Sequence, residues 1–374
     1  MKYRFCMLLM CLLLFGINPV HAEQNEETLE QFLTTLFSKR ADTLIKPAPE
    51  VLKDYYNRQW PSSDRAYKQE FLRSIYLNTW ADSRDISLLD SESRVHILDK
   101  SINGDLAKVR VKHDEKIDYL HKQQFIPPFD IDSFKIGTIH HMVLRKNKDS
   151  WTVVRDDFSD PIAAPPDRIP KSASVQYFPE PQDDSNQSVA KQQVQKRYNR
   201  EKAVHYANKY AGFPFNEDKL GVYNRKYRDF NDYGGDCTNF VSQVLGDKEE
   251  GGGLPMTDDW YYRNGKHSKS WAHTDSFLNF LKTSGYAEFI KVGLFHEVTN
   301  PGSDFPNGAI NKLQPGDLIG YEKNNDIVHF SVVVGKNSQG YPVVNSHTAN
   351  RFHVPWDLGW DKNTKFWLIH IKDG

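Results

Sequence analysis

Cys237 is the residue of this sequence whose setting is best suited to chemistry. It follows Gly234, Gly235 and Asp236 and opens a stretch whose apolar residues recur at helical spacing, namely Phe240, Val241, Val244 and Leu245. The pattern predicts a helix with the thiol on its first turn, Asp236 as N-cap and the glycines in the turn before it. A helix N-terminus favours a thiolate, and its free amides can hold an oxyanion. We therefore expect a nucleophile rather than a small buried apolar residue.

The other two cysteines, Cys6 and Cys11, lie within residues 1–22. This segment has a basic start, an apolar run and a small residue, Ala22, before a cleavage point, which are the features of a removable signal peptide. We predict a chain that is secreted or periplasmic after cleavage. A single remaining thiol in an oxidising compartment indicates reactivity or pairing with another molecule.

Two histidines on a predicted hairpin supply the groups that a thiol nucleophile needs. The apolar, β-branched runs 327–334 and 343–348 are separated by a polar, glycine-containing segment, so they predict two antiparallel strands. If the hairpin is symmetric about Ser338, His329 pairs with His347, and Asn345 is its diagonal neighbour. Catalysis by a thiol nucleophile requires an imidazole base and a group that orients it. We predict Cys237 as nucleophile, His329 as base and either His347 or Asn345 as the orienting group.

The remaining titratable residues predict neither a metal nor a cofactor. His140 and His141 would face opposite sides of a strand, which argues against a shared metal. The acidic turn 322–326 contains a lysine and lacks the spacing of a calcium loop.

Composition narrows the class of partner. The 374 residues carry a net charge of −1 with a pI near 6.9, which gives no reason to expect nucleic acid or an anionic membrane as partner. The N-terminal apolar run is too short to favour a membrane span.

The chain divides into segments of different character. Residues 23–160 carry helical spacing first and then strand-like segments at 93–98, 107–112, 139–146 and 151–154, which predicts an α+β domain with an antiparallel sheet. The element order resembles the curved-sheet domains of the nuclear-transport-factor and cystatin type. Proline-rich residues 161–195 read as a linker. Residues 196–374 contain the cysteine and the hairpin and form the predicted catalytic domain.

Several motifs of the second domain resemble known families. Residues 236–241 and 315–319 are similar to the cysteine and Pro-Gly-Asp-Leu elements of NlpC-type cell-wall peptidases, which are related to CHAP amidases. The putative amidase domain family is closer still. Its pattern is matched by Tyr198-Asn199-Arg200, by the run from Gly234 to Gln243, by Trp260-Tyr261-Tyr262 and, with slight departures, by 329–331 and 345–348.

The resemblance implies a papain-like fold, a helix carrying the cysteine packed on an antiparallel sheet, and hydrolysis of amide bonds. Together with the predicted export, the similarity to NlpC-type peptidases implies a peptide or a peptidoglycan-like substrate. Two other functions stay open: an acyltransferase that uses the same residues, and an inactive binding module. The aromatic residues Trp260, Tyr261, Tyr262 and Trp271 either line a substrate groove or pack over the cysteine helix.

Overall fold

The computed structural model describes residues 27–122, 130–148, 150–162, 165–171, 198–213 and 223–373. The predicted signal peptide and most of the predicted linker lie outside these residues. The N-terminal part contains two long helices and four strands. They are α1 (Leu29–Ile45), α2 (Pro61–Ser83), β1 (Ile86–Asn103), β2 (Leu106–His121), β3 (Asp132–Asn147) and β4 (Ser150–Asp157).

The C-terminal part contains five helices and eight strands within the described residues. The helices are α3 (Arg200–Lys209), α4 (Cys237–Gly246), α5 (Lys269–Ala272), α6 (Thr274–Thr283) and α7 (Phe295–Thr299). The strands are β5 (Tyr262–Arg263), β6 (Lys266–His267), β7 (Ala287–Leu294), β8 (Leu318–Lys323), β9 (Asp326–Lys336), β10 (Pro342–Ser346), β11 (Asn350–Pro355) and β12 (Lys365–Ile371).

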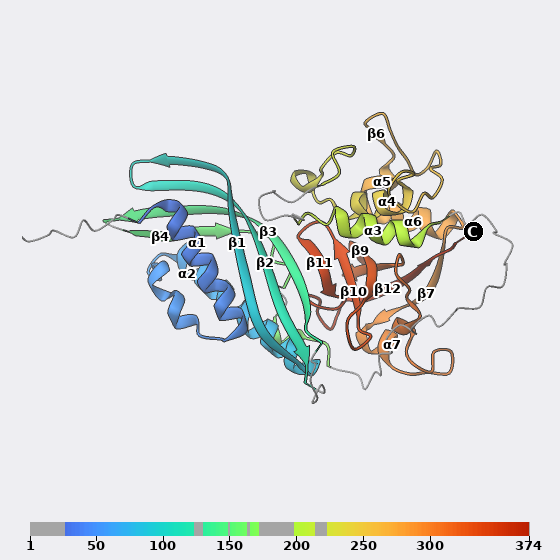
Figure 1. Cartoon of the computed structure of the whole chain (residues 1–374), viewed down its shortest axis with the longest axis horizontal. Helices are drawn as coiled ribbons and strands as arrows, with labels where there is room; N and C mark the ends of the chain where they lie inside the picture. Colours follow the sequence, from blue (N-terminus) through green and yellow to red (C-terminus); the bar gives the residue numbers. More distant parts are fainter. Residues whose placement is uncertain are drawn as a thin grey trace, which may run out of the picture.

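A single antiparallel sheet runs through both parts of the chain. Its strand order is β1-β2-β3-β11-β10-β9-β8-β12-β7, with β4 paired to β3 at the side. The two parts meet where β11 pairs with β3, with Asn350 opposite Gly137 and Phe352 opposite Lys135. The fold is therefore mixed α/β with a large antiparallel sheet (Figure 1).

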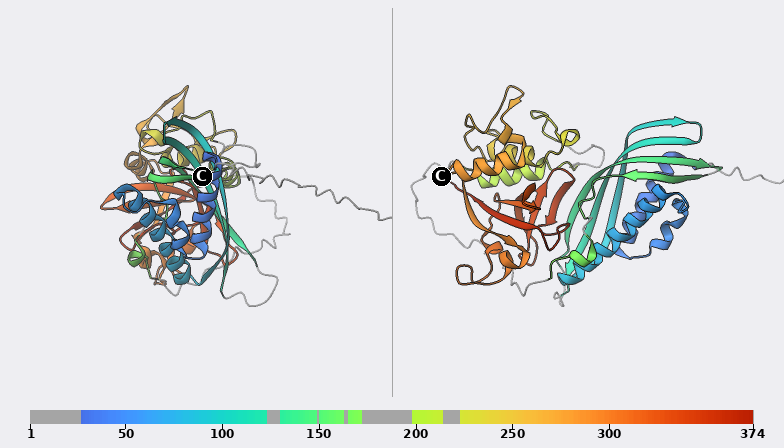
Figure 2. Two further views of the ribbon diagram at one scale, coloured as in Figure 1. Left: turned by 90° about the vertical axis from the view of Figure 1, so that its left-hand side faces the viewer. Right: turned by 180° about the vertical axis from the view of Figure 1, so that it is seen from behind.

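The N-terminal helices cover one face of the curved sheet formed by β1 to β4, and the C-terminal part lies on its other side (Figures 1 and 2). Helix α1 begins with a capping box, in which Thr28 and Gln31 exchange side-chain to backbone hydrogen bonds. Phe32, Leu36 and Phe37 of that helix are buried against the strands. The expected order of helices followed by an antiparallel sheet is confirmed, and β3 and β4 form the expected hairpin. The strands extend well beyond the predicted ranges, into polar segments that lack the pattern of apolar residues from which strands are predicted.

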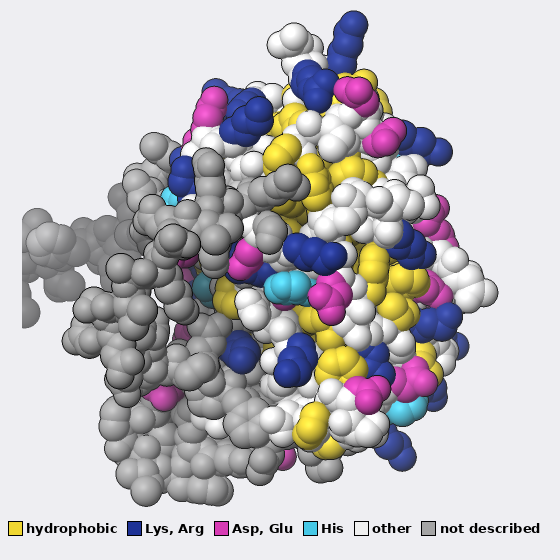
Figure 3. All heavy atoms as spheres, turned by 90° about the vertical axis from the view of Figure 1, so that its right-hand side faces the viewer, with side chains coloured by type: hydrophobic (Ala, Val, Ile, Leu, Met, Phe, Trp, Pro, Cys, Tyr) yellow, Lys and Arg dark blue, Asp and Glu magenta, His cyan; other side chains and the backbone are white. Residues whose placement is uncertain are grey.

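The C-terminal sheet has a different apolar cluster on each face. Phe330 and Val332 of β9 pack with Phe240 of α4 on the face covered by helices α3 to α6. Tyr321 of β8 and Val333 of β9 pack on the other face, with α7 and the segment 356–360. On the end of the C-terminal part seen in Figure 3, acidic and basic side chains are interspersed.

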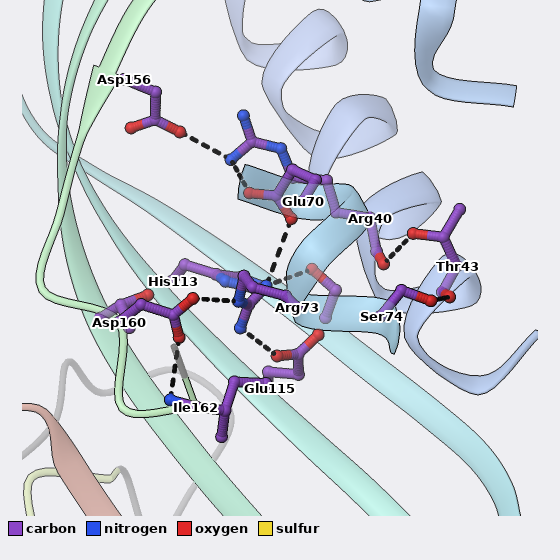
Figure 4. A network of polar contacts seen from close by, with 12 residues as sticks. Arg40, Thr43, Glu70, Arg73, Ser74, His113, Glu115, Asp156, Asp160 and Ile162 are labelled. Atoms are coloured by element: carbon purple, nitrogen blue, oxygen red, sulfur yellow. Dashed lines mark hydrogen bonds and ion pairs between the residues drawn. The ribbon is translucent and has the colours of Figure 1, made fainter. Parts of the chain in front are cut away.

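A cluster of ionised side chains is buried between the N-terminal helices and the sheet (Figure 4). Arg73 lies 2.8 Å from Asp160 and 3.3 Å from both Glu70 and Glu115. Arg40 completes the cluster, 2.8 Å from Asp156 and 3.6 Å from Glu70. Burying these charges costs free energy that the ion pairs must offset. Removing one side chain would therefore leave its partner buried and uncompensated.

Glu115 gives this cluster a pH dependence of definite sign. Burial raises its pKa from 4.5 to about 6. The folded chain therefore binds this proton more tightly than the unfolded chain. The resulting stability is complete below pH 4.5 and is lost as the pH rises through 6.

We expect the wild-type chain to lose roughly 2 kcal/mol more unfolding free energy than the Glu115→Gln variant between pH 4.5 and pH 7.5. Urea denaturation of both proteins at the two pH values measures this difference. Equal losses in the two proteins would show that Glu115 titrates normally in the folded state.

A second buried ion pair joins the two parts of the chain. Arg84, at the end of α2, lies 2.6 Å from Asp357. The same carboxylate accepts hydrogen bonds from Trp80 at 3.1 Å and Tyr341 at 2.5 Å, and it is fully buried. The segment 356–360 is thus anchored to an N-terminal helix.

We expect Arg84→Met to lower the free energy of unfolding by about 3–5 kcal/mol, because it leaves the Asp357 charge buried without its cation. Arg58→Met, which removes an exposed ion pair with Asp64, should cost less than about 1 kcal/mol. Guanidinium denaturation followed by tryptophan fluorescence measures both. Two separate transitions, with the C-terminal one unaffected by Arg84→Met, would show that the two parts fold independently.

Candidate active site

Helix α4 begins at Cys237, as the sequence predicts. Gly234 and Gly235 before it have φ values of 105° and 128°, a backbone conformation that favours glycine. Asp236 occupies the N-cap position, but its side chain makes no capping hydrogen bond. It accepts instead from the Phe230 backbone N–H and from the Asn239 side chain, both at 2.8 Å. The carboxylate is therefore fixed from several sides.

The Cys237 thiol is buried, with 7% of the residue exposed. Its sulfur lies 3.9 Å from the Thr238 hydroxyl and beside the backbone N–H of Phe330 on β9. Burial raises the pKa of the thiol, and hydrogen bonds from Phe330 and Thr238 only partly oppose this effect. The sequence predicted a thiolate favoured by the helix N-terminus. In the resting structure, the cost of burying a negative charge outweighs that contribution.

His347 lies at the N-terminus of α4, on the same face of the sheet as the helix. Its Nδ1 is 2.5 Å from Asp236 Oδ2 and its Nε2 is 2.6 Å from the Tyr210 carbonyl oxygen. The imidazole is stacked between Phe240 and Tyr223, with ring centroids 4.1 and 4.0 Å away. Both ring nitrogens thus face oxygen acceptors that belong to neither Cys237 nor His329.

Asn345 is also engaged elsewhere. Its amide nitrogen donates to the Ala207 carbonyl oxygen at 3.1 Å and to Asn208 Oδ1 at 2.9 Å. Its oxygen accepts from the backbone N–H of His353 at 2.7 Å. These contacts tie β10 to α3 and to β11.

His329 is buried on β9 and its ring lies 5.7 Å from the rings of both Tyr321 and Trp360. These aromatic residues belong to the cluster on the face opposite α4. Nε2 of His329 has no hydrogen-bond partner among the described residues. Burial and the nearby Arg351 cation lower the pKa of His329 to about 3. The imidazole is therefore neutral at physiological pH and has an unused nitrogen.

The hairpin register explains why the predicted partners do not meet. Within the pair, Asn345 lies opposite Val332 and Val344 opposite Val333, with an irregularity next to Val343. The symmetric hairpin predicted from the sequence pairs His329 with His347 and so places position 331 opposite Asn345, which is wrong by one residue. A shift of one residue exchanges the two faces of a strand. His329 and His347 consequently point to opposite faces of the sheet, and no hydrogen bond joins them.

The motifs that flank the cysteine support its helix. Arg200 ion-pairs with Asp317 at 2.7 Å, and the Tyr198 hydroxyl donates to the Gly316 carbonyl oxygen. Trp260 donates to Ser242, and Trp271 donates to Asn239. The sequence left two roles open for the aromatic segment: lining a substrate groove or packing over α4. The structure shows that Trp260 and Trp271 pack over α4.

Sequence reasoning missed two contributions to this site. Asp236 is the partner of His347, although its only sequence signal was its position before the cysteine. Trp360 and Arg351 surround His329, and they lie on segments that carry no recognisable motif. Within the described residues, no group of three or more His, Cys, Asp or Glu side chains could hold a metal ion. In the same part of the chain, no helix has the length and apolar character needed to cross a membrane.

The described residues form a mixed α/β fold with one buried thiol at a helix N-terminus, next to the Asp236–His347 pair. Residues 197–369 match the family model described as "Putative amidase domain". This match covers slightly less than half of the chain, agrees with the resemblance seen in the motifs and suggests an amidase-like function.

A curated relative and a solved structure complete the comparison. The uncharacterized protein YhbB of Bacillus subtilis is 27% identical over 189 residues, which cover 47% of this chain and 51% of the relative. The chain thus matches about half the length of this relative. The crystal structure of the intermembrane space region of the chloroplast protein ARC6 aligns over 33% of this chain and 88% of its own, with 12% identity and a TM-score of 0.23.

The two histidines should respond differently to substitution. We expect His347→Ala to lower the free energy of unfolding by about 2–4 kcal/mol, because it leaves the buried Asp236 carboxylate without its partner. His329→Leu should change it by less than about 1 kcal/mol, because it replaces an unpartnered imidazole by an apolar side chain of similar size. Urea denaturation tests both. A large loss for His329→Leu would mean that its imidazole has a structural role.

Proposed function

We propose that the chain is a thiol-dependent amidase or peptidase, exported by its N-terminal segment, with Cys237 as the nucleophile. The observation that carries this proposal is the placement of the sole described cysteine at the first turn of α4, within a segment that matches the model of an amidase domain family. Helix α4 also presents backbone amides near the sulfur, which suit an oxyanion.

We assign His329 as the base. The Cys237 sulfur lies beside the backbone amide of Phe330, and this nitrogen is bonded to the carbonyl carbon of His329. The imidazole is neutral, and its Nε2 has no hydrogen-bond partner among the described residues. The ring lies on the face of the sheet opposite α4, and its lowered pKa makes it a weak base in the resting structure. The proposed role therefore requires a rearrangement on substrate binding that brings the ring to the face of the sheet that carries Cys237 and relieves its burial.

The reaction then proceeds through a thioester. The Cys237 proton moves to His329 as sulfur attacks the amide carbonyl carbon. The C–N bond breaks, and the amine leaves with that proton. Water then attacks the thioester, which releases a carboxylic acid and restores the thiol. His347 and Asn345 are bonded elsewhere, so we assign them to holding β10 against α3 and α4.

Peptidoglycan peptides are the leading substrate class in this proposal. Export and the NlpC-like cysteine and Pro-Gly-Asp-Leu elements support it. Acyl transfer to an amine, the other reaction open to the same thioester, differs only in the acceptor.

Cell-wall fragments incubated with purified protein test this function. We expect new carboxylate and amine ends with the wild-type chain, and at least a thousandfold lower rates with Cys237→Ala and His329→Leu. Mass spectrometry of the soluble fragments detects the products, and Arg58→Met serves as an active control. Added glycylglycine distinguishes hydrolysis from transfer, because its incorporation into products would identify an acyltransferase. Equal product from Cys237→Ala would exclude thiol catalysis.

A further inference from the structure

A charged groove of about 220 Å³ lies on β1 to β3, near the junction with β11. Phe213, which follows α3, lines it from the C-terminal part of the chain. Glu115 of β2 contacts Arg73 of α2, so its neighbours Asp114 and Lys116, which line the groove, point to the face of the sheet away from that helix.

The sheet register builds the floor of the groove from two neighbouring rows of residues. One row crosses four strands as Glu92, Lys116, Lys135 and Phe352. The next row crosses the same strands as Arg94, Asp114, Gly137 and Asn350. Gly137 has no side chain, and a Cβ at this position would lie 3.0 Å from Asp114 Oδ1. The space over Gly137 is occupied by that oxygen, by Asn350 Cβ and by the edge of the Phe213 ring, at 3.0, 3.2 and 3.3 Å from the position of such a Cβ.

Lys135 is the unbalanced cation of this floor. Lys116 pairs with Asp118 at 2.9 Å and with Glu92 at 3.3 Å. Lys135 has no hydrogen bond or ion pair within the described part of the chain, and its ammonium lies 5.6 Å from the centre of the Phe352 ring. Burial and the positive charges of Arg94 and Lys116 lower the pKa of Lys135. Like charges directly opposite one another on a sheet are destabilising. The Asp114 and Glu92 carboxylates offset this repulsion only in part, since the pKa of Lys135 is still lowered.

Asp114 offers a second unused group in the same groove. Its Oδ2 lies 2.7 Å from the Lys112 ammonium, whereas Oδ1 is buried and has no hydrogen-bond partner among the described residues. Only 7% of the residue is exposed. A buried acceptor left unpaired costs free energy that an N–H donor on a ligand would recover.

We propose that this groove binds an amino-acid unit of a peptide that carries a carboxylate. Lys135 receives the carboxylate, with Arg94 and Lys116 adding positive charge, and Asp114 Oδ1 accepts an N–H of the same unit once the Phe213 ring moves aside. Lys135 and Asp114 lie in neighbouring rows, so together they match the carboxylate and the N–H of one such unit.

The groove is connected to the candidate active site by a short chain of contacts. Asn350, at the end of the second row, accepts a hydrogen bond from Tyr223 at 2.6 Å. Tyr223 stacks on His347, which contacts Asp236 next to Cys237. This inference rests on the proposed function, because it makes the groove a subsite for the substrate of that reaction. It names acidic peptides as the substrate class.

Calorimetric titration of the full chain carrying Cys237→Ala tests the subsite without turnover. Three synthetic peptides serve as probes. One is Ala-Gln-Lys-Ala with a free C-terminus, the second is Ala-Glu-Lys-Ala amide, and the third is Ala-Gln-Lys-Ala amide, which has no carboxylate. We expect at least tenfold tighter binding of one of the first two than of the third, and the tighter one shows whether the terminal or the side-chain carboxylate is held. Methylation of the backbone nitrogen of the peptide residue whose carboxylate is held should weaken binding of that peptide.

The Lys135→Met substitution in the same background should remove the preference for a carboxylate, while Lys108→Met, which changes an exposed lysine of β2, should keep it. The Tm of Lys135→Met should be unchanged or higher, because the repulsion from Lys116 is relieved. A preference that survives Lys135→Met, or its absence in the parent, overturns the proposal. Binding of inorganic phosphate that depends on Lys135, without peptide binding, also overturns it. The wild-type chain could hydrolyse nothing while the Cys237→Ala chain still shows a preference for a carboxylate that depends on Lys135. That combination would support the subsite and refute the proposed function.

Discussion

The pairing of β11 with β3 is the contact on which the whole arrangement depends. It turns two sets of strands into one sheet and fixes the position of the C-terminal part against β1 to β3. Arg351 lies in the middle of this pairing, opposite Ile136. Its guanidinium donates to the Pro161 and Leu358 carbonyl oxygens, each at 2.7 Å. Backbone pairing of the two strands and the side-chain hydrogen bonds of Arg351 therefore both hold the junction together.

This junction also forms the surroundings of His329. The segment 356–360 carries Trp360 against Tyr321 and His329, and Asp357 of the same segment is held by Arg84 from α2. The N-terminal part thus supports one wall around the proposed base. The N-terminal part consequently has a direct structural connection to the surroundings of His329.

The elements with strong periodicity could be predicted from the sequence. The start of α4 at Cys237, the β9–β10 hairpin, and the face shared by Asn345 and His347 follow from apolar spacing and glycine positions. The register of the hairpin did not follow, because an irregularity next to Val343 shifts it by one residue. Such a shift depends on turn geometry and packing, and alternation alone does not encode it. The continuity of the sheet through β3 and β11 was equally hidden, because each strand alone satisfies the pattern of an ordinary antiparallel strand.

Burial decides the resting state of the site. It raises the pKa of Cys237 and lowers the pKa of His329, so both groups are uncharged at neutral pH. An uncharged pair is inert until the site opens or substrate brings the two groups together. Rapid acid quenching during turnover of cell-wall fragments, followed by peptide mapping, tests the central claim most directly. The account predicts a thioester-linked fragment on the peptide that contains Cys237. Continued turnover with no adduct on that cysteine, and no loss of turnover when Cys237 is blocked, would contradict it.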